Sequence, residues 1–231
     1  MDEPSFKNVR SLLKRVELLA GARLFETGEE AAHVLFIEEG IASSFLPMPD
    51  GRDVEILQTG PEGMVGRHAI SATADTPYRT TMTTDGLVLM LPVKAFVDVV
   101  RQHQPLQHLL ELYVYCCELQ LAQFAISCLS HRLNVRLARW LLMCQDRLQS
   151  NALPFTHDFV ASCLGTRRAG ITNELHILEG MHAIKASRGL IEILDAEPIR
   201  NVAGNSYGLP ENEYRRLISP LAIASREIQL A

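Results

Sequence analysis

The sequence predicts an α+β protein: an N-terminal antiparallel β-roll of the jelly-roll kind, then a long helix, then a C-terminal winged helix-turn-helix. Short apolar runs separated by glycines fill the first hundred residues, and a stretch without Gly or Pro follows Pro105. A helix, a glycine turn, a second helix and a hairpin follow after residue 153. The expected parts are residues 1–104 (β-roll), 105–130 (long helix), 131–195 (winged helix-turn-helix) and 196–231 (C-terminal extension).

The composition is that of an ordinary folded protein. With 47 % apolar and 21 % charged residues, the chain is neither disordered nor collagen-like. No uninterrupted apolar run approaches the length of a membrane span, and no basic segment followed by an apolar stretch opens the chain. Five cysteines without scaffold-like spacing indicate a reducing compartment. We therefore expect a cytoplasmic protein without a membrane partner.

Charge is unevenly distributed along the chain. Residues 1–130 carry 10 Lys and Arg against 17 Asp and Glu, whereas residues 131–195 carry 8 against 6. An acidic front half beside a mildly basic segment is compatible with one module that meets phosphates and another that does not.

Four apolar runs in the front third predict the strands of the β-roll. A hairpin turn of type I′ is expected at Asp50-Gly51, because both residue types tolerate positive φ. A helix is expected before the strands, from the spacing of Val9, Leu12, Leu13 and Val16. The predicted strands contain residues 34–37, 41–46, 54–57 and 87–91.

The long helix has one dominant apolar stripe at steps of three and four. This stripe is longer than a small β-roll can cover, so a seam between two copies of the chain is preferred over packing on its own domain. The paired thiols Cys116 and Cys117 are interpreted as inert buried side chains, with a redox role as the alternative. The expected seam consists of Leu106, Leu110, Tyr113, Cys117, Leu121 and Phe124.

The segment after residue 153 has clear boundaries. Thr156 is an expected N-cap with Asp158 in the first helical turn, and Gly165 is expected to end that helix. A second helix is expected over residues 167–179, and a hairpin over residues 183–194. The core face of the second helix is expected to be Ile171, Leu175 and Leu178.

The opposite face of the second helix fits the major groove of DNA. Arg donates paired hydrogen bonds to guanine, and Asn pairs with adenine. Basic residues on the hairpin are expected near phosphates, where they attract the backbone without reading sequence. The alternative is an ordinary solvated helix face. The expected DNA-binding residues are Arg167, Arg168, Thr172, Asn173, His176, Lys185 and Arg188.

These residues resemble the Crp–Fnr family of transcription regulators. The resemblance rests on residues 164–172 (LGTRRAGIT), Leu178-Glu179 and the Ser187-Arg188-Gly189 turn. It rests also on the glycine pattern of a cyclic-nucleotide-binding-like β-roll, at Gly28-Glu29, Gly40, Asp50-Gly51 and residues 60–66 (GPEGMVG). The resemblance implies a homodimer that binds a palindromic site in double-stranded DNA, with RNA polymerase as a further partner. Activation is the expected effect, although the sequence does not separate it from repression.

The effector site departs from the family pattern. Members that bind cyclic AMP carry a Glu where this chain has Met64, and a thioether cannot accept a hydrogen bond from ribose as a carboxylate does. Arg79-Thr80 stands where the family holds the cyclic phosphate, with a structural role for Arg79 as the alternative. Cyclic AMP is therefore not the expected effector, and the effector is unknown. The candidate effector pocket contains Met64, Val65, Gly66, Arg79 and Thr80.

Cofactors and catalysis are not expected. The iron–sulfur branch of the family needs an N-terminal cysteine cluster, and the first cysteine here is Cys116. No spacing signal supports a metal or a haem, for which His33 or His68 would be the ligands. No nucleophile elbow, zinc motif or Walker loop indicates an enzyme.

The recognition helix also departs from the best-known members. Ala169 and Asn173 stand where those members have an acidic and a basic residue, so a different half-site is expected. The same departure keeps one alternative function open: a small-molecule-sensing module whose helix-turn-helix contacts protein.

Overall fold

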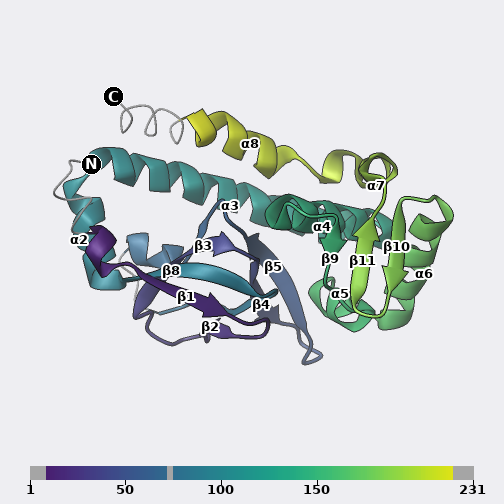
Figure 1. Cartoon of the computed structure of the whole chain (residues 1–231), viewed down its shortest axis with the longest axis horizontal. Coiled ribbons are helices and arrows are strands. Elements are labelled where there is room, and N and C mark those ends of the chain that lie inside the picture. Colours follow the sequence, from purple (N-terminus) through teal and green to yellow (C-terminus); the bar gives the residue numbers. More distant parts are fainter. Residues whose placement is uncertain (1–8, 72–74, 221–231) are drawn as a thin grey trace.

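The computed structural model describes residues 9–71 and 75–220. Figure 1 shows a β-sandwich beneath a long helix, α3, with the helix-turn-helix domain at one end. The C-terminal helix α8 returns along the opposite side of α3. The chain is thus an α+β protein with the predicted order of parts.

Two four-stranded antiparallel sheets form the sandwich. The first has the order β1-β8-β3-β6 and the second β2-β7-β4-β5. All four predicted apolar runs are strands, as β3, β4, β5 and β8. In chain order the elements are β1 (Lys14–Leu18), β2 (Arg23–Phe25), β3 (His33–Glu39), β4 (Ala42–Pro47), β5 (Asp53–Thr59), β6 (Met64–Val65), η1 (Arg67–Ser71), β7 (Arg79–Met82) and β8 (Gly86–Pro92).

One local prediction for this region holds only in part, and another is wrong. Among the described residues the expected helix is present over residues 9–12, but it does not reach Val16, because Val16 belongs to β1 and pairs with Val88 of β8. The turn after β4 is not of type I′, since only Gly51 has positive φ, at 81°. Its N–H donates to the carbonyl of Met48 (2.9 Å). Pro49 presets φ for an ordinary turn, and the glycine then takes the left-handed position.

The long helix packs against other parts of the same chain. The helices are α2 (Val93–Gln102) and α3 (Gln104–Ser130). Tyr113 of α3 is buried, and its hydroxyl accepts from the Met64 N–H (3.0 Å) and donates to the Met64 carbonyl (3.1 Å). A side chain at Gly63 would overlap the Tyr113 ring, which explains one glycine of the GPEGMVG run.

The six residues expected to form a seam between two copies all belong to this intramolecular cluster. Leu110, Tyr113 and Cys117 are buried in it, and Leu106, Leu121 and Phe124 are half-buried against it. The reason is that the sandwich and α8 together cover more of α3 than helical periodicity alone indicates. By length and composition α3 also meets the criteria for a membrane span. One side of α3 packs against the sandwich and α8, and about a third of its most apolar part is buried.

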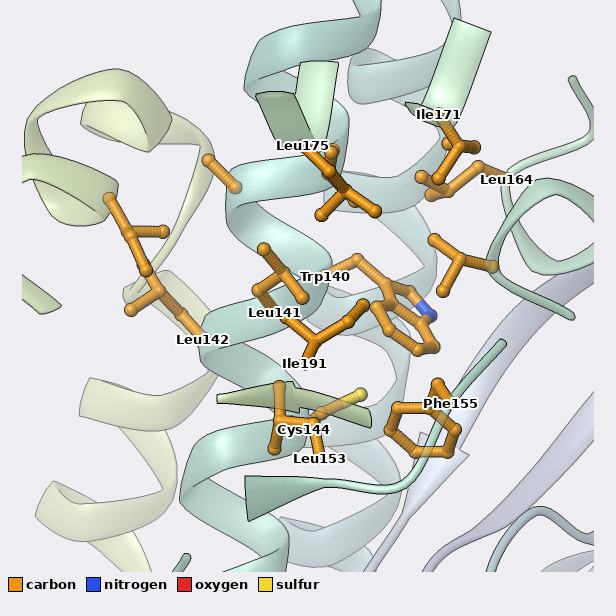
Figure 2. Packing of buried hydrophobic residues seen from close by; sticks show 14 of the residues in the cluster. Trp140, Leu141, Leu142, Cys144, Leu153, Phe155, Leu164, Ile171, Leu175 and Ile191 are labelled. Carbon is orange, nitrogen blue, oxygen red and sulfur yellow. The ribbon is translucent and has the colours of Figure 1, made fainter. Parts of the chain in front are cut away.

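The C-terminal domain is built around α4. Figure 2 shows Trp140, Leu141 and Cys144 of α4 packed against Phe155, Ile171 and other apolar side chains. The three-stranded wing sheet has the order β10-β11-β9. The elements are α4 (Leu133–Leu148), β9 (Ala152–Leu153), α5 (His157–Cys163), α6 (Arg168–Gly180), β10 (Ile184–Ser187), β11 (Leu190–Ile193), α7 (Ala196–Ala203), η2 (Gly204–Ser206) and α8 (Leu209–Leu217).

The extension after residue 195 ties the two domains together. Helix α7 packs on α4, and α8 packs on α3. The Tyr207 hydroxyl donates to the Asp146 carboxylate of α4, and the Tyr214 hydroxyl donates to the Glu62 carbonyl of the sandwich (2.7 Å). This segment therefore contacts both the sandwich and the helix-turn-helix domain.

Candidate nucleic-acid interface

The turn between α5 and α6 has the predicted local chemistry. The Thr156 hydroxyl caps α5 by accepting from the Phe159 N–H (3.1 Å). Gly165 follows α5 with φ of 59°, a conformation that glycine adopts without strain. Arg167 is the N-cap of α6, so the second helix begins within one residue of the prediction.

The two faces of α6 separate as predicted. Ile171, Leu175 and Leu178 are at most 4 % exposed and lie in the apolar core. Arg167, Arg168, Asn173 and His176 are exposed on the other side, whereas Thr172 is half-buried. A rigid apolar back with a polar front is what a recognition helix needs to enter the major groove.

A groove of about 350 Å³ lies between the N-terminus of α5, helix α6 and the wing. It brings together three of the predicted residues, Arg168, His176 and Arg188. Arg167, Thr172, Asn173 and Lys185 do not line it. Lys185 is exposed on β10 opposite Glu192 of β11, and Gly189 makes the wing turn with φ of 76°.

Three polar contacts position residues of this face. Arg168 Nη1 lies 3.4 Å from Asp158 Oδ2, and both side chains are about two-thirds exposed. The Thr172 hydroxyl lies 2.9 Å from His157 Nδ1, which ties α6 to the start of α5. Glu179 accepts from the Ala186 N–H (2.8 Å) and so fixes the wing against the end of α6.

Sequence reasoning missed three residues of this surface. His157 and Asp158 enter it through their contacts with Thr172 and Arg168, and position in the first turn of α5 was their only sequence signal. Ile177 is 57 % exposed on α6, although helical apolar side chains are usually assigned to the core. An exposed apolar side chain beside Asn173 and His176 fits contact with a thymine methyl group.

The candidate effector pocket in the sandwich is nearly filled. The cavity there has a volume of about 10 Å³, and Val65, Gly66 and Thr80 line it. Met64 is buried away from it, and Arg79 forms an ion pair with Asp53 while lying 5.1 Å from the Phe45 ring centre. The Thr80 hydroxyl is hydrogen-bonded to Ser44 (3.0 Å). A volume of this size accommodates a water molecule and not a nucleotide.

No metal-binding arrangement is found within residues 9–71 and 75–220. There, no group of three or more His, Cys, Asp and Glu side chains is arranged to hold an ion. His33 and His68, the residues considered as haem ligands, belong to the sandwich, at the start of β3 and in η1.

Both halves of the chain match known domain families. Residues 15–103 match the cyclic nucleotide-binding domain, and residues 135–202 match the Crp-like helix-turn-helix domain. No curated protein sequence matches the chain significantly.

Solved structures share the fold over most of the chain. FixK2 from Bradyrhizobium japonicum is 13 % identical with a TM-score of 0.72, over 83 % of this chain and 98 % of that one. The c-di-GMP-responsive global regulator CLP of Xanthomonas campestris is 13 % identical with a TM-score of 0.67, over 83 % and 99 %. A CRP-family transcriptional regulator from Thermus thermophilus is 21 % identical with a TM-score of 0.60, over 83 % and 96 %.

Proposed function

We propose that this chain, which belongs to the Crp/Fnr family of DNA-binding transcription regulators, acts as a homodimer that reads a palindromic site through the exposed face of α6. The observation that carries the proposal is the division of α6 into a buried apolar face and a face with Arg168, Asn173 and His176. Arg168 and Asn173 supply the side chains that read guanine and adenine, and Lys185 and Arg188 contact the phosphates. RNA polymerase is the expected partner at the promoter, and the cytoplasm the expected compartment.

A second stripe on α3 supports dimerisation. Only about a third of the most apolar part of α3 is buried within the protomer, so much of it still needs cover. A row at heptad spacing stays exposed or half-buried on the side away from the cluster that contains Tyr113. We place the contact with the second copy along this row, which consists of Tyr115, Leu119, Ala122, Ile126 and Leu129.

The regulator works without cyclic AMP. The support is the filled pocket of the sandwich, in which Thr80 is bound to Ser44 and Arg79 is held by Asp53. Binding of the nucleotide there requires these contacts to break and the cavity to open. Isothermal titration calorimetry should therefore give no heat of binding at micromolar cyclic AMP, and micromolar affinity would overturn this part of the proposal.

Selection of genomic DNA fragments by the purified, reduced protein tests DNA reading. We expect one enriched sequence with two-fold symmetry and a footprint on both half-sites. The affinity should fall linearly on a log–log plot of binding constant against salt, because Lys and Arg displace counterions from phosphates. Absence of enrichment, together with a salt-independent protein partner, would favour the alternative in which the helix-turn-helix contacts protein.

The dimer is tested by two charge substitutions one residue apart. Ile126→Glu places a charge in the exposed row and should convert the dimer to a monomer in analytical ultracentrifugation, with loss of the symmetric footprint. Ala125→Glu extends the series of Glu111 and Glu118 at seven-residue spacing and should leave the dimer intact. Equal effects of the two variants would place the contact elsewhere.

A further inference from the structure

A cavity of about 640 Å³ lies where the parts of the chain meet. Its walls come from the loop before β6, from α3, from the end of α4 and from the extension with α7 and α8. Pockets of 300–1,000 Å³ are typical of small-molecule sites. The junction cavity therefore has the room for an organic ligand that the sandwich pocket lacks.

Side chains of both charges line this cavity. Arg147 is buried, with Nε 2.9 Å from Glu62 Oε1 and Nη1 donating to the Met143 carbonyl (3.1 Å). Arg200 and Arg215 lie at the exposed rim. Each guanidinium has five N–H donors, so donors remain for an anionic group.

Glu211 of α8 contributes the complementary charge. Its Oε2 atom is buried and has no hydrogen-bond partner among residues 9–71 and 75–220, although the charges of Arg139 and Arg147 act on the group. A buried acceptor without a donor is unfavourable. Because Glu211 lines the cavity, its carboxylate can turn toward a ligand donor there, which removes the deficit.

Aromatic and thiol side chains form the remaining wall of the cavity. The Tyr113 and Tyr214 hydroxyls already contact backbone groups of the sandwich, so both side chains are anchored where they line the cavity. Burial raises the pKa of Cys116 to about 11, so this thiol is protonated and neutral at physiological pH. These groups favour an apolar portion of a ligand.

We propose that the junction cavity binds a hydrophobic α-amino acid as the effector of this regulator. The ammonium group meets Glu211, the carboxylate meets the rim guanidiniums of Arg200 and Arg215, and the side chain packs on the tyrosine rings. The role as effector rests on the proposed DNA-binding function, whereas the binding itself does not.

Such a ligand contacts α3, α7 and α8 at once, in a cavity whose other walls come from the sandwich and α4. Because it binds the arrangement in which these elements surround the cavity, it shifts the population toward that arrangement. The orientation of α6 relative to the sandwich then depends on the concentration of the amino acid.

Isothermal titration calorimetry of the full chain tests the binding. The probes are L-leucine, L-isoleucine, L-valine, L-methionine, L-phenylalanine, L-tyrosine and L-tryptophan. We expect at least one to bind at millimolar concentration or below, and Glu211→Gln to weaken it at least tenfold. Glu213→Gln on the same helix, whose carboxylate pairs with Arg216 outside the cavity, should leave the affinity unchanged.

Absence of binding by all seven amino acids would overturn the proposal, as would equal affinity of Glu211→Gln and the unmodified chain. Arg200→Gln serves as a second variant, because its exposed position spares the fold, and it should also weaken binding. The calorimetry measures amino-acid binding in the absence of DNA, so its result can be interpreted even if the DNA-binding proposal fails. The effect of the bound amino acid on DNA affinity is then measured separately by fluorescence anisotropy.

Discussion

The core of the helix-turn-helix domain is almost wholly apolar, whereas the sandwich buries a series of serine and threonine side chains. Trp140, Phe155 and Leu175 represent the first kind of interior. In the second, the Ser44 and Thr80 hydroxyls are hydrogen-bonded (3.0 Å), and Thr83 donates to Ser43 (2.6 Å). The helix-turn-helix domain thus uses its core to hold a DNA-reading surface rigid. The sandwich has polar groups typical of a ligand pocket but satisfies them internally.

The largest expected effect breaks the apolar core beneath α6. Leu175→Ala should lower the free energy of unfolding by about 2–5 kcal/mol, because a fully buried leucine leaves a cavity. Ile177→Ala, two residues away and 57 % exposed, should change it by less than about 0.5 kcal/mol. Urea unfolding of both variants checks this, and equal losses would mean that α6 does not present two different faces.

The next effect concerns the recognition of DNA and not the stability of the fold. Arg168→Ala should cost about 1–3 kcal/mol of DNA binding and relax the preference at one base pair. Asp158→Asn should strengthen binding and steepen the salt dependence, because it frees Arg168 from a carboxylate 3.4 Å away. Anisotropy titrations on the selected site and its single-base variants measure both. Equal weakening of Arg168→Ala on all sequences would make Arg168 a phosphate contact.

A third prediction tests the buried contact between the sandwich and helix α4 of the helix-turn-helix domain. Glu55 of β5 is buried, and it accepts from Trp140 Nε1 of α4 (2.6 Å) and from Gln58 Nε2 (2.9 Å). Burial raises the pKa of this carboxyl, although hydrogen bonds from Ser43, Gln58 and Trp140 oppose the shift. The folded chain therefore binds a proton more tightly than the unfolded chain.

The sign of the pH dependence follows from this shift. As pH rises through the window above the ordinary glutamate pKa, the contribution of Glu55 to stability falls, by about 1.4 kcal/mol for each unit of raised pKa. Glu55→Gln should abolish that fall, which unfolding measurements across pH check against Glu118→Gln, an exposed control. Parallel curves of unfolding free energy against pH for the unmodified chain, Glu55→Gln and Glu118→Gln would contradict the prediction.

The smallest effect concerns the sandwich interior. Thr80→Val alone leaves the Ser44 hydroxyl without its partner and should cost about 1 kcal/mol, whereas Thr80→Val with Ser44→Ala should be nearly neutral. A double-mutant cycle by urea unfolding measures the coupling. Additive losses would show that the two hydroxyls are satisfied independently. This result would weaken the interpretation that the polar groups of the sandwich pocket satisfy one another.

Prediction from the sequence succeeded where the signal was local. The Thr156 cap, the Gly165 turn and the stripe of Ile171, Leu175 and Leu178 each depend on residues within one or two helical turns, so their chemistry is visible in the chain itself. The wrong prediction at Val16 arose because three apolar residues at helical spacing precede a strand. In that strand, pairing with Val88 outweighs local periodicity.

Hydrophobic periodicity and capping chemistry act over a few residues, so the chain alone predicted four of the eight sandwich strands, the length of α3 and the two faces of α6. The folded structure was needed to show which stripe of α3 is buried within the chain, how Arg79 is engaged by Asp53, and that Glu211 and Arg147 line the same cavity. These outcomes depend on contacts between segments far apart in the chain. Two apolar stripes of one helix look alike in the sequence, and only the position of the packing segments shows which of them is buried.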